Sequence, residues 1–169
     1  MTDQQFWTII ESGGPKAQDD PERQLAAVRK RLAGLPPEEL HDFQRLFNEK
    51  LVAAYSWDLW GAAYLINGGS SDDGFHYFRE WLISRGRAAY EAAIQNPDNL
   101  AGLTDPERDD YEFEDLGYVA QQVYEEQTGE EMASVETSWP ADPRGRQWDF
   151  DDGEQVVRKL PKLAAIYLG

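Results

Sequence analysis

The stretch NGGSSDDGFHYFREWLISRGR, residues 67–87, holds the side chains best placed to do chemistry. If it is helical from Asp72 onward, His76 lies one turn after Asp72 and Glu80 one turn after His76. Two carboxylates and an imidazole at this spacing can bind a divalent cation such as zinc or manganese. Asp72, His76 and Glu80 are therefore a candidate metal site, although any acidic helix start followed by one histidine gives the same pattern.

The same stretch also suits the start of a helix that has no further role. Ser70 or Ser71 can accept hydrogen bonds from the first free amides, and Asp72 and Asp73 fit the positive first turn. Glu80 and Arg79 then make surface pairs. Both explanations stay open from the sequence.

A wider ligand site is conceivable around the helix that precedes this stretch. Its candidate residues are Trp57, Asp58, Trp60, Tyr64, Asp72, Asp73, His76 and Arg79. Asp58 stands between Trp57 and Leu59; if buried it needs a partner, for which Arg79 or Arg85 is suitable, and otherwise it caps the helix after Ser56. The aromatic residues form either a ligand cage or ordinary core.

Known catalytic motifs are missing, so no catalytic residue is assigned. The sequence contains no GxxxxGK[ST], GxGxxG, GxSxG or HExxH pattern, and no cofactor is expected. The 169 residues include no cysteine, which excludes disulfides and thiol chemistry and fits a cytoplasmic protein. No run of eighteen apolar residues occurs, so no membrane span is expected.

The net charge of −16 is concentrated in one part of the chain. Residues 96–155 hold eighteen acidic and three basic residues, whereas residues 1–95 hold fourteen and ten. A surface of this kind repels phosphate backbones, so nucleic-acid binding is not expected. A basic protein partner is favoured instead, and a merely solvated surface is the plain alternative.

Helical periodicity and turn signals predict an all-α fold with six or seven helices. Thr2 with Gln5 predicts a capping box, and Asp20 before Pro21 predicts a second helix start. One helix is expected over 75–94 with a possible break at Gly86, and a final one over 152–167 with a kink or restart at Pro161.

We expect a single domain, 1–169, in three parts. Residues 1–101 form the helical core, 102–152 an acidic helix followed by a long irregular connection, and 153–169 a basic helix that packs back. Trp139, Trp148 and Phe150 are expected to hold the connection against the core at intervals.

The span Trp57–Ala101 resembles a bacterial family known as domain of unknown function 4240. Residues that carry the resemblance include Trp60, Ala62, Ala63, Tyr64, Gly68, Gly69, Ser71, Asp72, Asp73, Phe75, Tyr77, Phe78, Arg79, Trp81, Leu82 and Ile83, followed by Gly86, Arg87, Asn96, Pro97, Asp98 and Leu100. The opening TDQQFWTIIE is also similar to family starts. The resemblance implies no known function and transfers no catalytic residue.

Two functions follow as expectations. The first is a regulatory module that binds a protein, plausibly one with a basic surface, through the acidic part of the chain. The second is a small-molecule- or divalent-metal-dependent enzyme with a cleft beside Asp58, Asp72, Asp73, His76 and Arg79.

Overall fold

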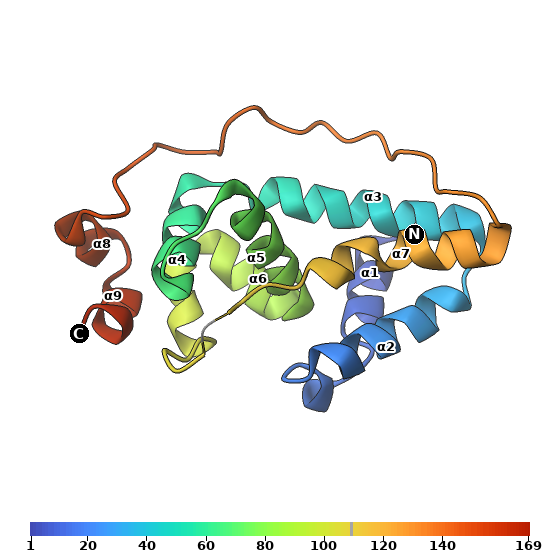
Figure 1. Ribbon diagram of the computed structural model, residues 1–169, viewed down its shortest axis with the longest axis horizontal. Coiled ribbons are helices and arrows are strands. Elements are labelled where there is room, and N and C mark those ends of the chain that lie inside the picture. Colours follow the sequence, from blue (N-terminus) through green and yellow to red (C-terminus); the bar gives the residue numbers. More distant parts are fainter. Residues whose placement is uncertain (109) are drawn as a thin grey trace.

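The computed structural model describes residues 1–108 and 110–169, and all its regular elements are helices (Figure 1). The α-helices are α1 (Asp3–Ile10), α2 (Pro21–Ala33), α3 (Pro37–Ala53), α4 (Trp57–Asn67), α5 (Asp72–Ser84), α6 (Arg87–Gln95), α7 (Glu114–Thr128), α8 (Gly153–Lys159) and α9 (Pro161–Tyr167), with 3₁₀ helices η1 (Pro15–Ala17) and η2 (Pro97–Gly102). The described residues include one isolated bridge, between Ser56 and Arg144, and no strand. The all-α prediction is confirmed.

The predicted number of six or seven helices is wrong because two predicted helices are each divided. Gly86 separates α5 from α6 with φ +93°, a conformation that favours glycine. The carboxylate of Glu11 occupies the space where a Cβ would lie at Gly86, and it accepts a hydrogen bond from the amide of Arg87 at 3.0 Å. Leu160 leaves helical geometry, and Pro161 starts α9.

Local capping signals are confirmed at three helix starts. Thr2 and Gln5 form the capping box of α1, and the side chain of Asp20 accepts from the amide of Arg23 at the start of α2. Ser71 caps α5 by accepting from the amide of Gly74, so Asp72 and Asp73 occupy the first turn. Capping therefore explains these residues locally, whatever else they contact.

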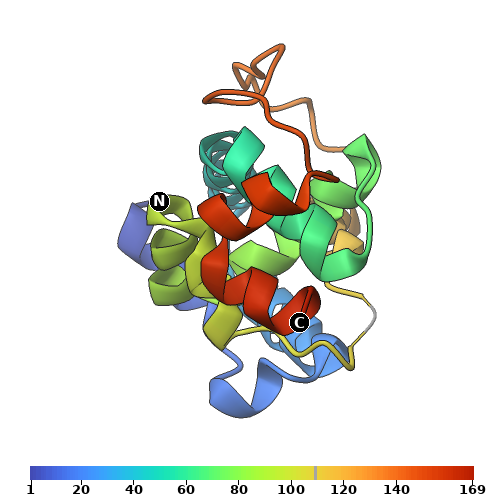
Figure 2. The same ribbon diagram turned by 90° about the vertical axis from the view of Figure 1, so that its left-hand side faces the viewer.

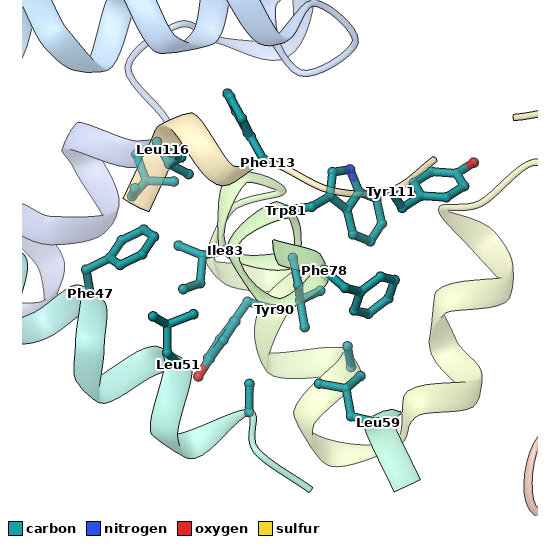
Figure 3. Packing of buried hydrophobic residues seen from close by; sticks show 14 of the residues in the cluster. Phe47, Leu51, Leu59, Phe78, Trp81, Ile83, Tyr90, Tyr111, Phe113 and Leu116 are labelled. Carbon is teal, nitrogen blue, oxygen red and sulfur yellow. The ribbon is translucent and has the colours of Figure 1, made fainter. Parts of the chain in front are cut away.

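Helix α7 holds the helical body together, because it packs against α2, α3 and α5. In Figure 1 it runs alongside α3, above α2. Its apolar stripe of Leu116, Val119, Ala120 and Val123 is almost fully buried. Figure 3 shows Leu116 and Phe113 above a cluster of core side chains that includes Trp81 and Phe78 of α5. Burial of these large apolar side chains is the main stabilising contribution.

The C-terminal helices α8 and α9 lie at one end of the molecule (Figure 2), where α9 packs against α4 and η2. The buried carboxylate of Asp98 accepts hydrogen bonds from the amides of Lys162, at 3.0 and 3.1 Å, and of Leu163, at 3.0 Å. These amides belong to the first turn of α9, whose donors have no partner within the helix. Asp98 thus anchors the start of α9 from a distant part of the chain.

Residues 130–152 contain no helix and pass over the outside of the helical body (Figures 1 and 2). Tyr55 and Trp57 exchange backbone hydrogen bonds with Arg144, at 2.8 and 3.0 Å, and Asn48 donates to Thr137 at 3.1 Å. We call residues 130–152 the strap. It crosses α3 and α4 and returns the chain to α8.

Only one of the three expected aromatic contacts of the strap is fully buried. Trp148 is 9% exposed, and its ring lies over Gly61, where a Cβ would be 2.2 Å from Cζ2. Phe150 is half-buried against the ring of Trp57. Trp139 is the most exposed of the three, at 51%, and it lies near His76 and Tyr118.

Among the helices of the described residues, none combines the length and the apolar character that crossing a bilayer requires.

Candidate functional site

Helix α5 carries three polar side chains, those of His76, Arg79 and Glu80, into the region between α3 and α7. Arg79 and Glu80 are 5% and 4% exposed, although both carry ionisable side chains. His76 lies one turn earlier and is about one third exposed. Buried ionisable groups are costly unless each is paired, so their partners define what the site can do.

Arg79 is held by a backbone carbonyl and two aromatic rings. Its Nη1 donates to the carbonyl of Leu51 at 2.7 Å, and its guanidinium carbon lies 4.8 Å from the ring centroids of both Tyr55 and Phe75. Burial lowers the pKa of Arg79 to about 10, so it is still a cation at neutral pH. It links the end of α3 to the middle of α5.

Glu80 has one oxygen in a hydrogen bond and one without a partner. Oε1 lies 3.2 Å from Nε2 of His76, while the buried Oε2 has no hydrogen-bond partner among the residues that the structure describes. Burial raises the pKa of Glu80, and the contact with His76 partly offsets this. Gly117 of α7 makes the space, because a Cβ there would lie 2.1 Å from Oε1.

His76 connects Arg79 and Glu80. Its Nδ1 lies 3.4 Å from Nη2 of Arg79, and a guanidinium can only donate, so Nδ1 accepts. The ring proton therefore belongs on Nε2, which donates to Glu80. Both ring nitrogens are engaged, and we call Arg79, His76 and Glu80 the α5 triad.

Two hollows meet at His76. One has a volume of about 370 Å³ and lies between α3, α5, α7 and the strap, with Glu80 on its wall. The other, of about 690 Å³, is lined by Tyr55, Asp72, Asp73 and Arg79. His76, Tyr118 and Trp139 line both. The pair forms a groove beside α5 whose rim carries two exposed aromatic side chains, Tyr118 and Trp139.

The structure divides the predicted ligand-site residues into two groups. Asp72, Asp73, His76 and Arg79 lie together along the second hollow. The four from α4 do not line either hollow of the groove. Trp57 and Trp60 stack on one another with ring centroids 5.5 Å apart, and Tyr64 donates to Asp151 of the strap at 2.9 Å.

Asp58 is exposed, so the condition for a buried pair with Arg79 or Arg85 is not met, and the expectation that it caps α4 is wrong. Its Oδ1 accepts from Nε1 of Trp148 at 3.0 Å and pairs with Lys159 at 3.2 Å, and it does not cap α4, because Ser56 does. Arg85 instead donates to the carbonyl of Gln18. Asp58 therefore helps to fix the strap and α8.

The proposed metal ligands Asp72, His76 and Glu80 do not converge. In the part of the chain that the structure describes, no group of three or more histidine, aspartate or glutamate side chains is arranged to hold a metal ion. The expectation that Glu80 forms surface pairs is also wrong, since it is buried against His76.

Sequence reasoning missed Gly117 and the buried position of Glu80. A glycine inside the otherwise regular apolar stripe of α7 was the available signal, because such a glycine often marks a close approach. Gln44 and Asn48, which also line the first hollow, lie on α3 and carried no signal of their own.

No curated protein and no solved structure matches this chain significantly. A family described as proteins of unknown function, DUF4240, matches residues 1–126, which include the whole α5 triad and Gly117 but not the strap. The resemblance expected from the sequence is thus confirmed, and the chain belongs to the DUF4240 family.

Proposed function

We propose that this protein is a binding module for a protein partner with a basic surface. The observation that carries the proposal is the concentration of acidic residues on the outward side of α7 and in the chain that follows it. Residues 109–143 contain eleven acidic residues and no lysine, arginine or histidine. An uninterrupted stretch of one sign attracts the opposite sign over distances longer than a contact.

The acids of α7 point in one direction. Glu114, Asp115, Glu125 and Glu126 are exposed, and their spacing places them on the side opposite the buried stripe. Exposed Glu130 and Glu131 follow directly. We call these six residues the acidic face.

Most of this charge is not neutralised within the chain. Arg29 pairs with Glu126 at 2.9 Å. Among the described residues, the other five acids of the acidic face have no cationic group within 4 Å. Their mutual repulsion is relieved when a basic surface binds, which favours association.

Two exposed aromatic residues adjoin the acidic face. Tyr118 lies on α7 among the acids with 45% of its surface exposed, and Trp139 of the strap is near it across the groove. Exposed tyrosine and tryptophan are typical of the centres of protein interfaces, where they supply apolar contact area.

The test compares two variants with equal charge. One replaces acids of the acidic face, D115N, E125Q and E130Q, and the other replaces exposed acids elsewhere, D19N, E22Q and E38Q. Partners are captured from a lysate of the native host, identified, purified and titrated. We expect the first variant to weaken binding at least about tenfold and the second to change it less than about threefold. Equal weakening by the two variants would contradict the proposal.

The alternative is a small-molecule- or divalent-metal-dependent enzyme at the groove. The observation that favours it is the hydrogen-bonded pair of His76 and Glu80 at the wall of a hollow. Binding is favoured over catalysis because both ring nitrogens of His76 are engaged within the α5 triad, and because Asp58 lies elsewhere. A thermal-shift screen with divalent metal ions and metabolites tests the alternative.

A further inference from the structure

The hollow beside Glu80 has the size and lining of a ligand site. Its volume of about 370 Å³ lies within the usual range for small ligands. Phe47, Leu51 and Met132 supply apolar walls, and Gln44 and Asn48 supply amide groups. We call it the Glu80 pocket.

Among the described residues that line this pocket, Glu80 is the one with a buried side-chain oxygen that lacks a hydrogen-bond partner. The side chain is buried, its Oε2 has no partner, and burial of an unpaired carboxylate oxygen is costly. Gly117 keeps open the space that the carboxylate occupies, because any larger residue would displace it. A group that donates hydrogen bonds to Oε2 would remove this cost.

The charges around the pocket favour a hydrogen-bond donor that is a cation. Among the residues that line the pocket, none is lysine or arginine, and the exposed Glu131 is one of them. Arg79, the residue before Glu80, instead donates to the carbonyl of Leu51 and contacts His76. Tyr118 and Trp139 at the rim offer ring faces that attract cations.

We propose that the Glu80 pocket binds one organic cation, an ammonium or guanidinium group on a short apolar stem. The head hydrogen-bonds Oε2, and the stem lies against Phe47 and Met132. The terminal torsion of glutamate is soft, so a rotation directs the buried Oε2 into the pocket, and Oε1 turns with it beside His76. A bound cation also stabilises the ionised carboxylate that burial disfavours.

The cation has two possible sources. A lysine or arginine side chain of the basic partner carries this group, and in that case the inference rests on the proposed function. A free amine or guanidine carries the same group without a protein. The experiment separates these sources.

The probes are n-butylguanidinium and its neutral analogue n-butylurea, titrated into the full chain and followed by the NMR shifts of backbone amides. We expect saturable binding of n-butylguanidinium at residues of the Glu80 pocket and no binding of n-butylurea. E80Q should weaken binding at least about tenfold, since it removes a charged acceptor. E22Q, which removes an equal charge from exposed surface of α2 outside the acidic face and the groove, should leave the affinity unchanged.

Equal affinity of wild type and E80Q, or equal binding of the two probes, overturns the inference. If E80Q does not fold, W139A serves instead, because Trp139 is exposed and its loss does not disturb the core. It should weaken binding at least about twofold, as expected for loss of a cation–π contact, and an unchanged affinity overturns the inference.

A peptide containing arginine and the same peptide with citrulline identify the source. Binding of the arginine peptide with the same dependence on Glu80 indicates a partner side chain, whereas binding of the small probe alone indicates a free amine. If the captured partner binds E80Q as tightly as wild type and no probe binds, the inference fails and the proposed function stands. If the probe binds but no basic partner is captured, the proposed function fails and the inference stands.

Discussion

The carboxylate of Glu80 fills the space that a side chain at position 117 would need. Glycine in the interior of a helix normally costs about 0.5–1 kcal/mol relative to alanine. Here an alanine Cβ would lie 2.1 Å from Oε1 of Glu80, which is far closer than non-bonded atoms approach. The carboxylate would have to move and would lose its hydrogen bond to His76.

We therefore expect G117A to lower the free energy of unfolding by about 1 kcal/mol, measured by urea denaturation, because the lost hydrogen bond outweighs the gain in helix propensity. In an E80A background the same substitution should raise the free energy of unfolding by about 0.5–1 kcal/mol, since the Glu80 carboxylate is no longer in the way. G153A, at a position with open space around it, is the control for a substitution without a clash. A stabilising effect of G117A in the wild-type background would show that Glu80 is not confined.

Contacts with other elements, rather than its own residues, hold α9 in place. Helix α9 has seven residues, too few to be stable alone in water. Its position depends on packing against α4 and η2, and on Asp98, whose carboxylate replaces a local cap. Leu160, at the N-cap position, supplies no side-chain hydrogen bond.

Replacement of Asp98 by alanine should lower the free energy of unfolding by about 1–3 kcal/mol, because buried amides lose a charged acceptor. Hydrogen exchange at the amides of Lys162 and Leu163 should accelerate before global unfolding occurs. D98N keeps one acceptor oxygen, so its free energy of unfolding should fall less than that of D98A. If exchange at these two amides is unchanged in D98A, Asp98 does not anchor α9.

Negative charge is spread unevenly over the whole molecule. The acidic face covers the outward side of α7 and the start of the strap. The bases Arg158, Lys159 and Lys162 belong to α8 and α9 at the other end in Figure 1, where the acids of residues 149–154 adjoin them and offset their charge. The acidic face is therefore the surface that orients a basic partner before contact.

Association with the captured partner should slow at least about tenfold when salt rises from about 0.1 M to about 1 M, because the screening length falls from about 10 Å to about 3 Å. The dissociation rate should change much less, since short-range contacts determine it. Stopped-flow mixing or surface-based kinetics measures both rates. An association rate independent of salt would show that the acidic face does not guide the partner.

Much of the fold could be predicted from local residues. Thr2, Asp20 and Ser71 begin helices through contacts with amides three residues away, so the relevant partners lie in the same short stretch. The apolar stripe of α7 is likewise periodic within one element. The sequence indicates only a possible helix break at Gly86. The carboxylate of Glu11 packs against Gly86 in the structure, and it lies 75 residues earlier in the chain, where no local pattern reveals the contact.

The groove could be predicted only in part. Asp72, Asp73, His76 and Arg79 were found as a group because they belong to one helix. Asp58 and Tyr64 were assigned to the same site, but the strap and α8 supply their partners. Residues separated by 87 to 101 positions make these contacts, and no local pattern records such pairs.

The sequence by itself determined that this chain is helical, that it belongs with DUF4240, and that its negative charge is gathered after residue 95. These properties follow from residue types and short spacings. The tertiary structure decided that Glu80 is buried beside Gly117, that His76 joins it to Arg79, and that Asp98 holds α9. Burial depends on which elements pack against one another, and that packing is settled by the summed contacts of the whole chain rather than by any one segment.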